Sequence, residues 1–258
     1  MMTHESGHLA AGDGTGLFWQ SWLPEGAEKA TVLLVHGMSE HSGRYRPLAE
    51  MLAGRGLRVN AYDHRGHGLS EGRRGWVARF EDLLDDLELF MARARAGGGP
   101  LFMLAHSMGG LVAIAYLLAG RPTPDSLVLS GPAIVPFVDG SDRSIDPSRL
   151  TKDPEMQKAY MDDPLILRDR VDPELYLRLA EGIMTFPGRA HEIGLPVLLI
   201  HGEDDPLCSV EGASDYVAGF SSQDKTVIVY PGGRHEMLNE TNRDQVMDDL
   251  WQWVEARL

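Results

Sequence analysis

The stretch L-F-M-L-A-H-S-M-G-G, residues 101–110, decides the fold expected for this chain. Its apolar half, 101–105, has the character of a buried strand and leads into a turn of small residues around Ser107. An apolar helical run, 111–118, follows at once. Such a strand–turn–helix lifts a serine hydroxyl clear of the sheet and points the helix N-terminus at the reacting centre. The pattern predicts Ser107 as a nucleophile, with Ala105 standing where the motif usually has glycine.

Short apolar runs that suit strands recur on both sides of this stretch. Several are apolar on both faces, as strands buried in a parallel sheet are. The expected strands are 17–22, 31–35, 57–62, 101–105, 127–130, 197–200 and 226–230. Amphipathic or buried helical patterns lie between or after them, at 83–94, 111–118 and 246–254. This alternation predicts an α/β fold with a doubly wound, mostly parallel sheet.

One long segment breaks the alternation, between the strands expected at 127–130 and 197–200. It is rich in proline and charge but also carries apolar clusters, so it is not a plain loop. Short helices are expected to begin near its prolines, Pro154, Pro164 and Pro173. We expect residues 1–133 and 191–258 to form the core, and 134–190 to form a helical cap over the C-terminal edge of the sheet.

The composition of the chain excludes several classes of function. The 258 residues include 24 Lys and Arg against 38 Asp and Glu, a formal net charge of −14. Nucleic-acid binding is not expected, because phosphate contacts need clustered cations. The single cysteine cannot form an internal disulfide. The N-terminal residues lack a signal-peptide pattern, and no apolar stretch approaches the roughly 20 residues of a membrane span, so a cytoplasmic location is predicted.

A serine hydroxyl needs a base, and in folds with this turn the acid and then the histidine follow the serine. Three histidines follow Ser107: His191, His201 and His235. His201 ends a strand and His191 lies in the connection that leaves the cap, so structural roles are expected for both. His235 lies in the loop after the strand expected at 226–230, where a ring can reach the serine. It is the predicted general base.

The acid that orients the histidine should lie in H-G-E-D-D-P-L-C, residues 201–208. Glu203, Asp204 and Asp205 all compete for that role. Pro206 restricts the residue before it to extended backbone, which helps to fix the direction of Asp205. Spacing favours Asp205 over Asp204 only slightly, and the residues alone leave both open.

The tetrahedral intermediate of acyl transfer needs an oxyanion hole. One donor is expected to be the backbone N–H of Met108, directly after the nucleophile. The second should come from the loop in V-L-L-V-H-G-M-S-E-H-S-G-R-Y, residues 32–45. There Gly37 lets the chain turn so that the N–H of Met38 can face the site.

Five separated motifs resemble one known family. H-G-M-S-E-H-S-G-R-Y, D-H-R-G-H-G-L-S-E-G (63–72), H-S-M-G-G, H-G-E-D-D-P-L-C and R-H-E occur in the order found in the monoacylglycerol lipases. These belong to the lysophospholipase-like branch of the α/β-hydrolases. The resemblance implies the α/β-hydrolase fold, a triad of Ser107, Asp205 and His235, and backbone oxyanion donors at Met38 and Met108. It also selects Asp205 over Asp204.

The resemblance implies further roles. Glu40 and Arg44 match polar residues near the glycerol end of the family's pocket. Cys208 matches a cysteine near the active site in some members, although a small buried residue is the plainer interpretation. The segment 63–72 resembles a loop that shapes the site without doing chemistry, so structural roles are expected for its Asp63, His64 and His67.

The expected reaction is the hydrolysis of a lipid-like ester, monoacylglycerol above all, to fatty acid and glycerol. Apolar residues of the cap could line an acyl tunnel and make transient contact with a membrane or micelle. Neither a metal nor an organic cofactor is expected, because no H-E-x-x-H, G-x-G-x-x-G or P-loop pattern occurs. The alternatives are a general carboxylesterase, a thioesterase or a small peptidase of the same fold and, from another class, a non-catalytic binding protein.

Overall fold

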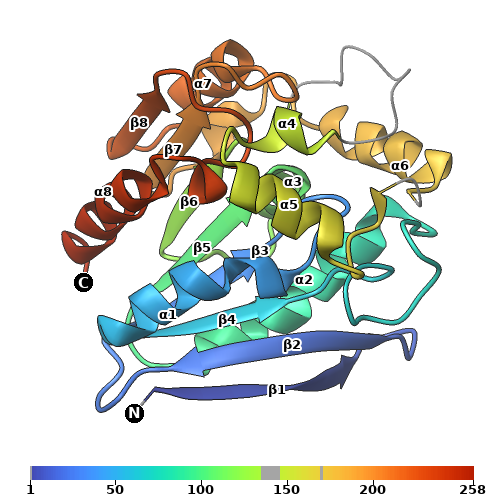
Figure 1. Cartoon of the computed structure of the whole chain (residues 1–258), viewed down its shortest axis with the longest axis horizontal. Helices are drawn as coiled ribbons and strands as arrows, with labels where there is room; N and C mark the ends of the chain where they lie inside the picture. Colours follow the sequence, from blue (N-terminus) through green and yellow to red (C-terminus); the bar gives the residue numbers. More distant parts are fainter. Residues whose placement is uncertain (1, 135–145, 169–170) are drawn as a thin grey trace.

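One twisted sheet runs through the molecule, for which a computed structural model describes residues 2–134, 146–168 and 171–258. Within these ranges the sheet has eight strands in the order β1-β2-β4-β3-β5-β6-β7-β8 (Figure 1). Strands β3 to β8 are mutually parallel, whereas β2 runs antiparallel to both β4 and β1. The strands are β1 (Thr3–Ala10), β2 (Gly16–Leu23), β3 (Ala30–Val35), β4 (Leu57–Tyr62), β5 (Leu101–His106), β6 (Ser126–Ser130), β7 (Val197–Gly202) and β8 (Lys225–Tyr230). The predicted mostly parallel α/β sheet is confirmed.

The seven strands expected from the sequence are all present, but β1 was not predicted. Most of its side chains are exposed, so its sequence T-H-E-S-G-H-L-A shows no alternation of apolar and polar residues. It forms because its backbone pairs along its whole length with β2, from Thr3 opposite Leu23 to Ala10 opposite Gly16. A strand held by edge pairing alone leaves little signal in the side chains.

Helices cover both faces of the sheet. Side chains alternate across each strand, so that Leu33 and Val35 of β3 belong to the core cluster on the face of α2, α3 and α7, while Val32 and Leu34 belong to the cluster on the face of α1 and α8. Burial on both faces explains the continuous apolar runs in the sequence. The core helices are α1 (Arg46–Gly54), α2 (Phe80–Arg95), α3 (Met108–Leu118), α7 (Val210–Ala218) and α8 (Arg243–Glu255).

The described part of the segment between β6 and β7 contains three α-helices: α4 (Pro147–Leu150), α5 (Pro154–Asp162) and α6 (Pro173–Ile183). Each begins with proline after an aspartate whose side chain accepts a hydrogen bond from a first-turn amide. The starts expected near Pro154 and Pro173 are confirmed. Pro164 begins only a turn, because the chain then crosses to the core, where the Leu167 amide donates to the Ser39 carbonyl (2.9 Å).

The end of α4 contacts the loop after β8, where the Glu236 amide donates to the Leu150 carbonyl (2.8 Å), and α6 packs against α3. Residues 135–145 and 169–170 of the cap expected at 134–190 lie outside the described residues. In the described part of the chain, no helix combines the length and apolar character needed to cross a bilayer. The cytoplasmic location remains a prediction.

Candidate active site

Ser107 lies at the sharp turn between β5 and α3. Its backbone has φ +52° and ψ −118°, a conformation that costs a non-glycine residue about 1–3 kcal/mol. The turn is held in place because the Ser107 amide donates to the Ser130 carbonyl at the end of β6 (3.0 Å). A Cβ on Gly109 would lie 2.3 Å from the Val35 carbonyl oxygen, so only glycine lets α3 start this close to β3. Ala105 fits into the core with no exposed surface.

Asp205 and His235 come together from the ends of two neighbouring strands. Asp205 follows β7 and His235 follows β8, and His235 Nδ1 donates to Asp205 Oδ2 over 2.8 Å. Their side chains are only 0% and 5% exposed. The other carboxylate oxygen accepts the amides of Leu207 (2.8 Å) and Cys208 (3.0 Å), which fixes the direction of the group.

The residues that competed for these roles lie in different surroundings. Asp204 is 57% exposed and pairs with Lys152, and His191 is also exposed. His201 is fully buried, and its Nε2 lies 2.9 Å from the same Asp205 oxygen that His235 uses. This second hydrogen bond to the carboxylate was missed by sequence reasoning. The spacing of four residues between His201 and Asp205 is its only signal in the sequence.

Burial and charge act in opposite directions on the pair. Burial alone would lower the pKa of His235, but the Asp205 carboxylate raises this pKa well above its ordinary value. Burial would raise the pKa of Asp205, yet His235 and His201 hold it well below its usual range. Asp205 therefore stays ionised and stabilises a positive charge on His235.

His235 also lies next to the serine turn. Its ring centroid is 4.8 Å from that of His106, the residue before Ser107. A Cβ on Gly131, just after β6, would lie 3.2 Å from His235 Nδ1, so this glycine leaves room for the ring. Ser107 is partly exposed, and its hydroxyl has no hydrogen-bond partner among the described residues. Such contacts commonly tighten only when substrate binds.

The loop after β3 approaches the same serine. A Cβ on Gly37 would lie 3.1 Å from Ser107 Cβ and 3.1 Å from the His106 ring. The Gly37 amide donates to Glu40 Oε1 (2.7 Å), which holds the turn. Among the described residues, the amides of Met38 and Met108 have no hydrogen-bond acceptor. Both remain available to a substrate.

Glu40 and Arg44 form a buried network that also includes Glu236. Arg44 Nη1 lies 2.8 Å from Glu40 Oε2, and the Arg44 guanidinium binds both oxygens of Glu236 (2.6 and 2.7 Å). The exposed fractions of the three side chains are 10% or less. Arg44 thus joins the Gly37 loop to the residue that follows His235. Glu236 was missed, because a pair separated by 192 positions leaves no local pattern.

Asp63, His64 and His67 lie behind the Gly37 loop and are fully buried. Asp63 accepts the amides of Ser42 (2.8 Å) and Leu69 (2.7 Å), so it ties two loops together. The His64 ring stacks edge-on against His36, 4.5 Å away. These contacts fit the structural roles expected for all three residues.

Glu240 links the His235 loop to the start of α5. This buried carboxylate accepts the amide of Arg234 (3.2 Å), next to His235, and the amide of Lys152 (2.9 Å). It also accepts the Thr241 amide (2.8 Å). A shift of this carboxylate would disturb both segments. Sequence reasoning missed Glu240 as well, because its partners are backbone groups distant in the chain.

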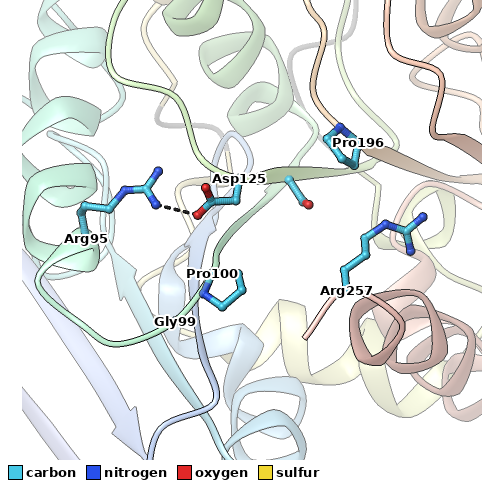
Figure 2. A pocket seen from close by; sticks show the side chains of 7 residues that line it. Arg95, Gly99, Pro100, Asp125, Pro196 and Arg257 are labelled. Atoms are coloured by element: carbon cyan, nitrogen blue, oxygen red, sulfur yellow. Dashed lines mark hydrogen bonds and ion pairs between the residues drawn. The ribbon is translucent and has the colours of Figure 1, made fainter.

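An open pocket of about 640 Å³ lies at the opposite edge of the sheet (Figure 2). Pro100, Asp125 and Pro196 line it, each just before the start of a strand. Arg95 at its rim pairs with Asp125 (2.6 Å). The pocket lies away from the strand ends that carry Ser107, Asp205 and His235, and it is not the candidate active site.

Comparison with known proteins agrees with this geometry. Residues 26–242 match the family model described as serine aminopeptidase, S33. A monoacylglycerol lipase of Mycolicibacterium smegmatis is 31% identical, and the alignment covers 98% of each chain. The monoglyceride lipase of Homo sapiens is 33% identical over 97% of this chain and 90% of its own. A crystal structure of a monoacylglycerol lipase from Paleococcus ferrophilus superposes with a TM-score of 0.82 at 25% identity, over the full length of both chains.

The fold and these matches agree on one assignment. The order of the eight described strands, the turn at Ser107 and the match over most of the chain all point to the same family. The chain is a member of the serine aminopeptidase S33 family of α/β-hydrolases, with monoacylglycerol lipases among its full-length relatives.

Proposed function

We propose that this protein hydrolyses carboxylic esters of lipid-like substrates, and monoacylglycerol above all, to fatty acid and glycerol. The observation that carries the proposal is the buried Asp205–His235 pair beside the strained turn of Ser107. The substrate class is supported by the full-length similarity to monoacylglycerol lipases.

In the first step, the Ser107 hydroxyl oxygen attacks the ester carbonyl carbon while its proton passes to His235 Nε2. Asp205 stabilises the imidazolium that forms, as its effect on the pKa of His235 indicates. The oxyanion is held by the amides of Met38 and Met108, and such a donor contributes about 3–4 kcal/mol in comparable sites.

In the second step, the tetrahedral intermediate collapses, and the alcohol leaves with the proton from His235. Water then attacks the acyl-Ser107 ester, gives one proton to His235 and releases the fatty acid. The serine hydroxyl recovers its proton, so the enzyme is regenerated. The scheme balances with the side chains and backbone amides of this chain alone.

Glu40 and Arg44 are proposed to serve the head-group end of the site chiefly by fixing its wall. Their charged groups already bind each other, Gly37 and Glu236, and little of either side chain is exposed. Truncating either residue would therefore loosen the loops that carry Met38 and His235.

Residues 134–190 are proposed to form the cap. Among its described residues, three large apolar side chains face solvent: Met161 (46% exposed), Leu177 (65%) and Met184 (72%). Exposed apolar side chains above a lipid-like site favour transient contact with a membrane or micelle.

The test is a substrate panel measured on the wild type and on Ser107→Ala. We expect monoacylglycerol to be cleaved with the highest kcat/KM, a short nitrophenyl ester more slowly, and an amino-acid amide least. Ser107→Ala should abolish all three activities. A preference for the amide would favour the second candidate, an aminopeptidase, which the description of the matching family supports. Full activity in Ser107→Ala would refute the mechanism.

A further inference from the structure

Cys208 lies beside the catalytic pair, and the proposed mechanism does not use its thiol. It is the only cysteine in the chain, and it is 6% exposed. One ligand atom each from Asp205, Cys208 and His235 lie within 4.8 Å of one another. The three atoms are a carboxylate oxygen, a sulfur and a ring nitrogen.

The backbone around Cys208 holds the thiol in this place. Its amide donates to Asp205 Oδ1 (3.0 Å), and its carbonyl accepts a hydrogen bond from His201 Nε2 (3.2 Å). The neighbouring Leu207 amide donates to the same carboxylate oxygen. The sulfur therefore belongs to the turn that presents the acid to His235.

We propose that Asp205, Cys208 and His235 form a site for a thiophilic divalent cation, Zn²⁺ in particular, whose binding inhibits the enzyme. Thiolate, imidazole and carboxylate are the usual protein ligands of zinc, with bonds of about 2.0–2.3 Å. The ligand atoms of a tetrahedral zinc ion stand about 3.3–3.7 Å apart. The three ligand atoms here lie within 4.8 Å of one another, so they need to approach by only about 1 Å. Water supplies the fourth ligand.

Inhibition follows from the groups that the ion occupies. Binding releases the thiol proton of Cys208 to solvent and takes up a lone pair on the His235 ring. The ion also neutralises the Asp205 carboxylate that stabilises the imidazolium. A metal-bound His235 cannot accept the hydroxyl proton of Ser107 as the proposed mechanism requires. The cation therefore acts as an inhibitor and not as a cofactor.

Direct binding is tested with Co²⁺, which replaces Zn²⁺ and shows a near-ultraviolet charge-transfer band when a thiolate binds it. The protein is Ser107→Ala, so the result does not depend on which ester the enzyme cleaves. Because Cys208 is the only cysteine, any such band reports on this residue. We expect a band that excess Zn²⁺ abolishes and that is missing in the Ser107→Ala/Cys208→Ser double variant. Absence of the band in Ser107→Ala would overturn the proposal.

Inhibition is tested on a nitrophenyl ester, with each variant compared with its own metal-free rate. Low micromolar Zn²⁺ should inhibit the wild type, EDTA should restore the rate, and Mg²⁺ should have no effect. Altering groups around a metal's ligands already costs about 10–100-fold in affinity, so Cys208→Ser should raise the half-inhibitory concentration at least about 10-fold. Cys208→Ala should do the same, and a thermal melt establishes that each variant is folded.

The matched control is His8→Gln, because His8 and His4 are exposed histidines four residues apart on β1 and could bind zinc adventitiously. His8→Gln should leave inhibition unchanged. If this variant relieves inhibition while Cys208→Ser does not, the inhibitory site lies on β1 and the proposal is wrong. A metal-free enzyme that cleaves no ester would contradict the proposed function instead, and the cobalt experiment would still decide the metal site.

Discussion

His235 and a cluster of three other histidines, His36, His64 and His67, are all buried, yet their pKa values shift in opposite directions. The Asp205 carboxylate, 2.8 Å away, raises the pKa of His235 well above its ordinary value, against the effect of burial. Burial lowers the pKa of His64 to about 3 and of His67 to about 4, and it lowers that of His36 well below normal. None of these three has a hydrogen-bonded carboxylate among the described residues.

The difference shows what turns a buried histidine into a base. Desolvation by itself keeps the ring neutral and inert, because it penalises the charged form. A fixed carboxylate reverses that penalty and makes the ring able to accept a proton during the reaction. The histidines of the cluster hold loops in position, and only His235 has both a charged partner and a place next to Ser107.

The largest effect is expected for Asp205→Asn, which leaves His235 buried without a charged partner. Loss of the acid in a comparable triad costs about 10⁴-fold in kcat, and we expect a loss of that order here. The pKa of His235 should fall, so the acid limb of the kcat/KM profile should move to lower pH. Steady-state kinetics over a pH range measure both changes.

Asp204→Asn is the matched control for this change. The Asp204 side chain is 57% exposed, and its ion-pair partner among the described residues is the surface residue Lys152. It should change kcat less than about twofold, because exposed ion pairs contribute little. Equal losses in the two variants would mean that Asp205 does not act as the partner of His235.

A smaller effect is expected for Glu240→Gln, which disturbs the position of His235 and not its charged partner. The glutamine has one acceptor oxygen where Glu240 uses two, so the partly buried amide of Arg234 or of Thr241 loses its partner. The Lys152 amide donates to both oxygens and keeps one of them. Loss of an amide's partner costs about 1–3 kcal/mol of stability, and we expect kcat to fall roughly 10-fold. The acid limb of the pH profile should stay where it is in the wild type.

Glu203→Gln is the corresponding control, since Glu203 is exposed and accepts one amide of the same loop, that of Gly232 (3.2 Å). It should leave kcat and the melting temperature nearly unchanged. A shifted acid limb in Glu240→Gln would show that Glu240 acts on the charge of His235, contrary to the positional role.

The smallest effect is expected for His67 of the buried histidine cluster, and it changes how the free energy of unfolding depends on pH. The pKa of His67 is about 4 in the folded state and about 6.5 in the unfolded chain. Between these values the unfolded state binds more protons, so the free energy of unfolding decreases as the pH falls. His67→Gln should reduce this slope by up to about 1.4 kcal/mol per pH unit. Urea unfolding between pH 4 and about 6.5 measures it.

His191→Gln serves as the control, because His191 is exposed and lies outside the buried cluster. Its slope should equal that of the wild type. If His67→Gln keeps the wild-type slope, then His67 is not held neutral in the folded protein.

Much of this protein could be predicted from local sequence. Seven of the described strands, the helix after Ser107 and two helix starts between β6 and β7 follow from apolar periodicity and from proline positions. These signals are local because a strand buried on both faces must be apolar throughout, and proline fits the first turn of a helix. The edge strand β1 could not be predicted in this way, because backbone pairing holds it.

The sequence also determined which groups are available for catalysis with Ser107. They are a turn of small residues, three later histidines and a run of three acidic residues. Only the tertiary structure decided which of them meet. It buried Asp205 against His235 and left Asp204 in solvent, although the two aspartates are neighbours in the chain. It also turned His201 toward the Asp205 carboxylate and brought in Glu236 and Glu240, whose partners include groups on distant loops. The physical reason is that desolvation and charge depend on what surrounds a group in space, which adjacency in sequence does not specify.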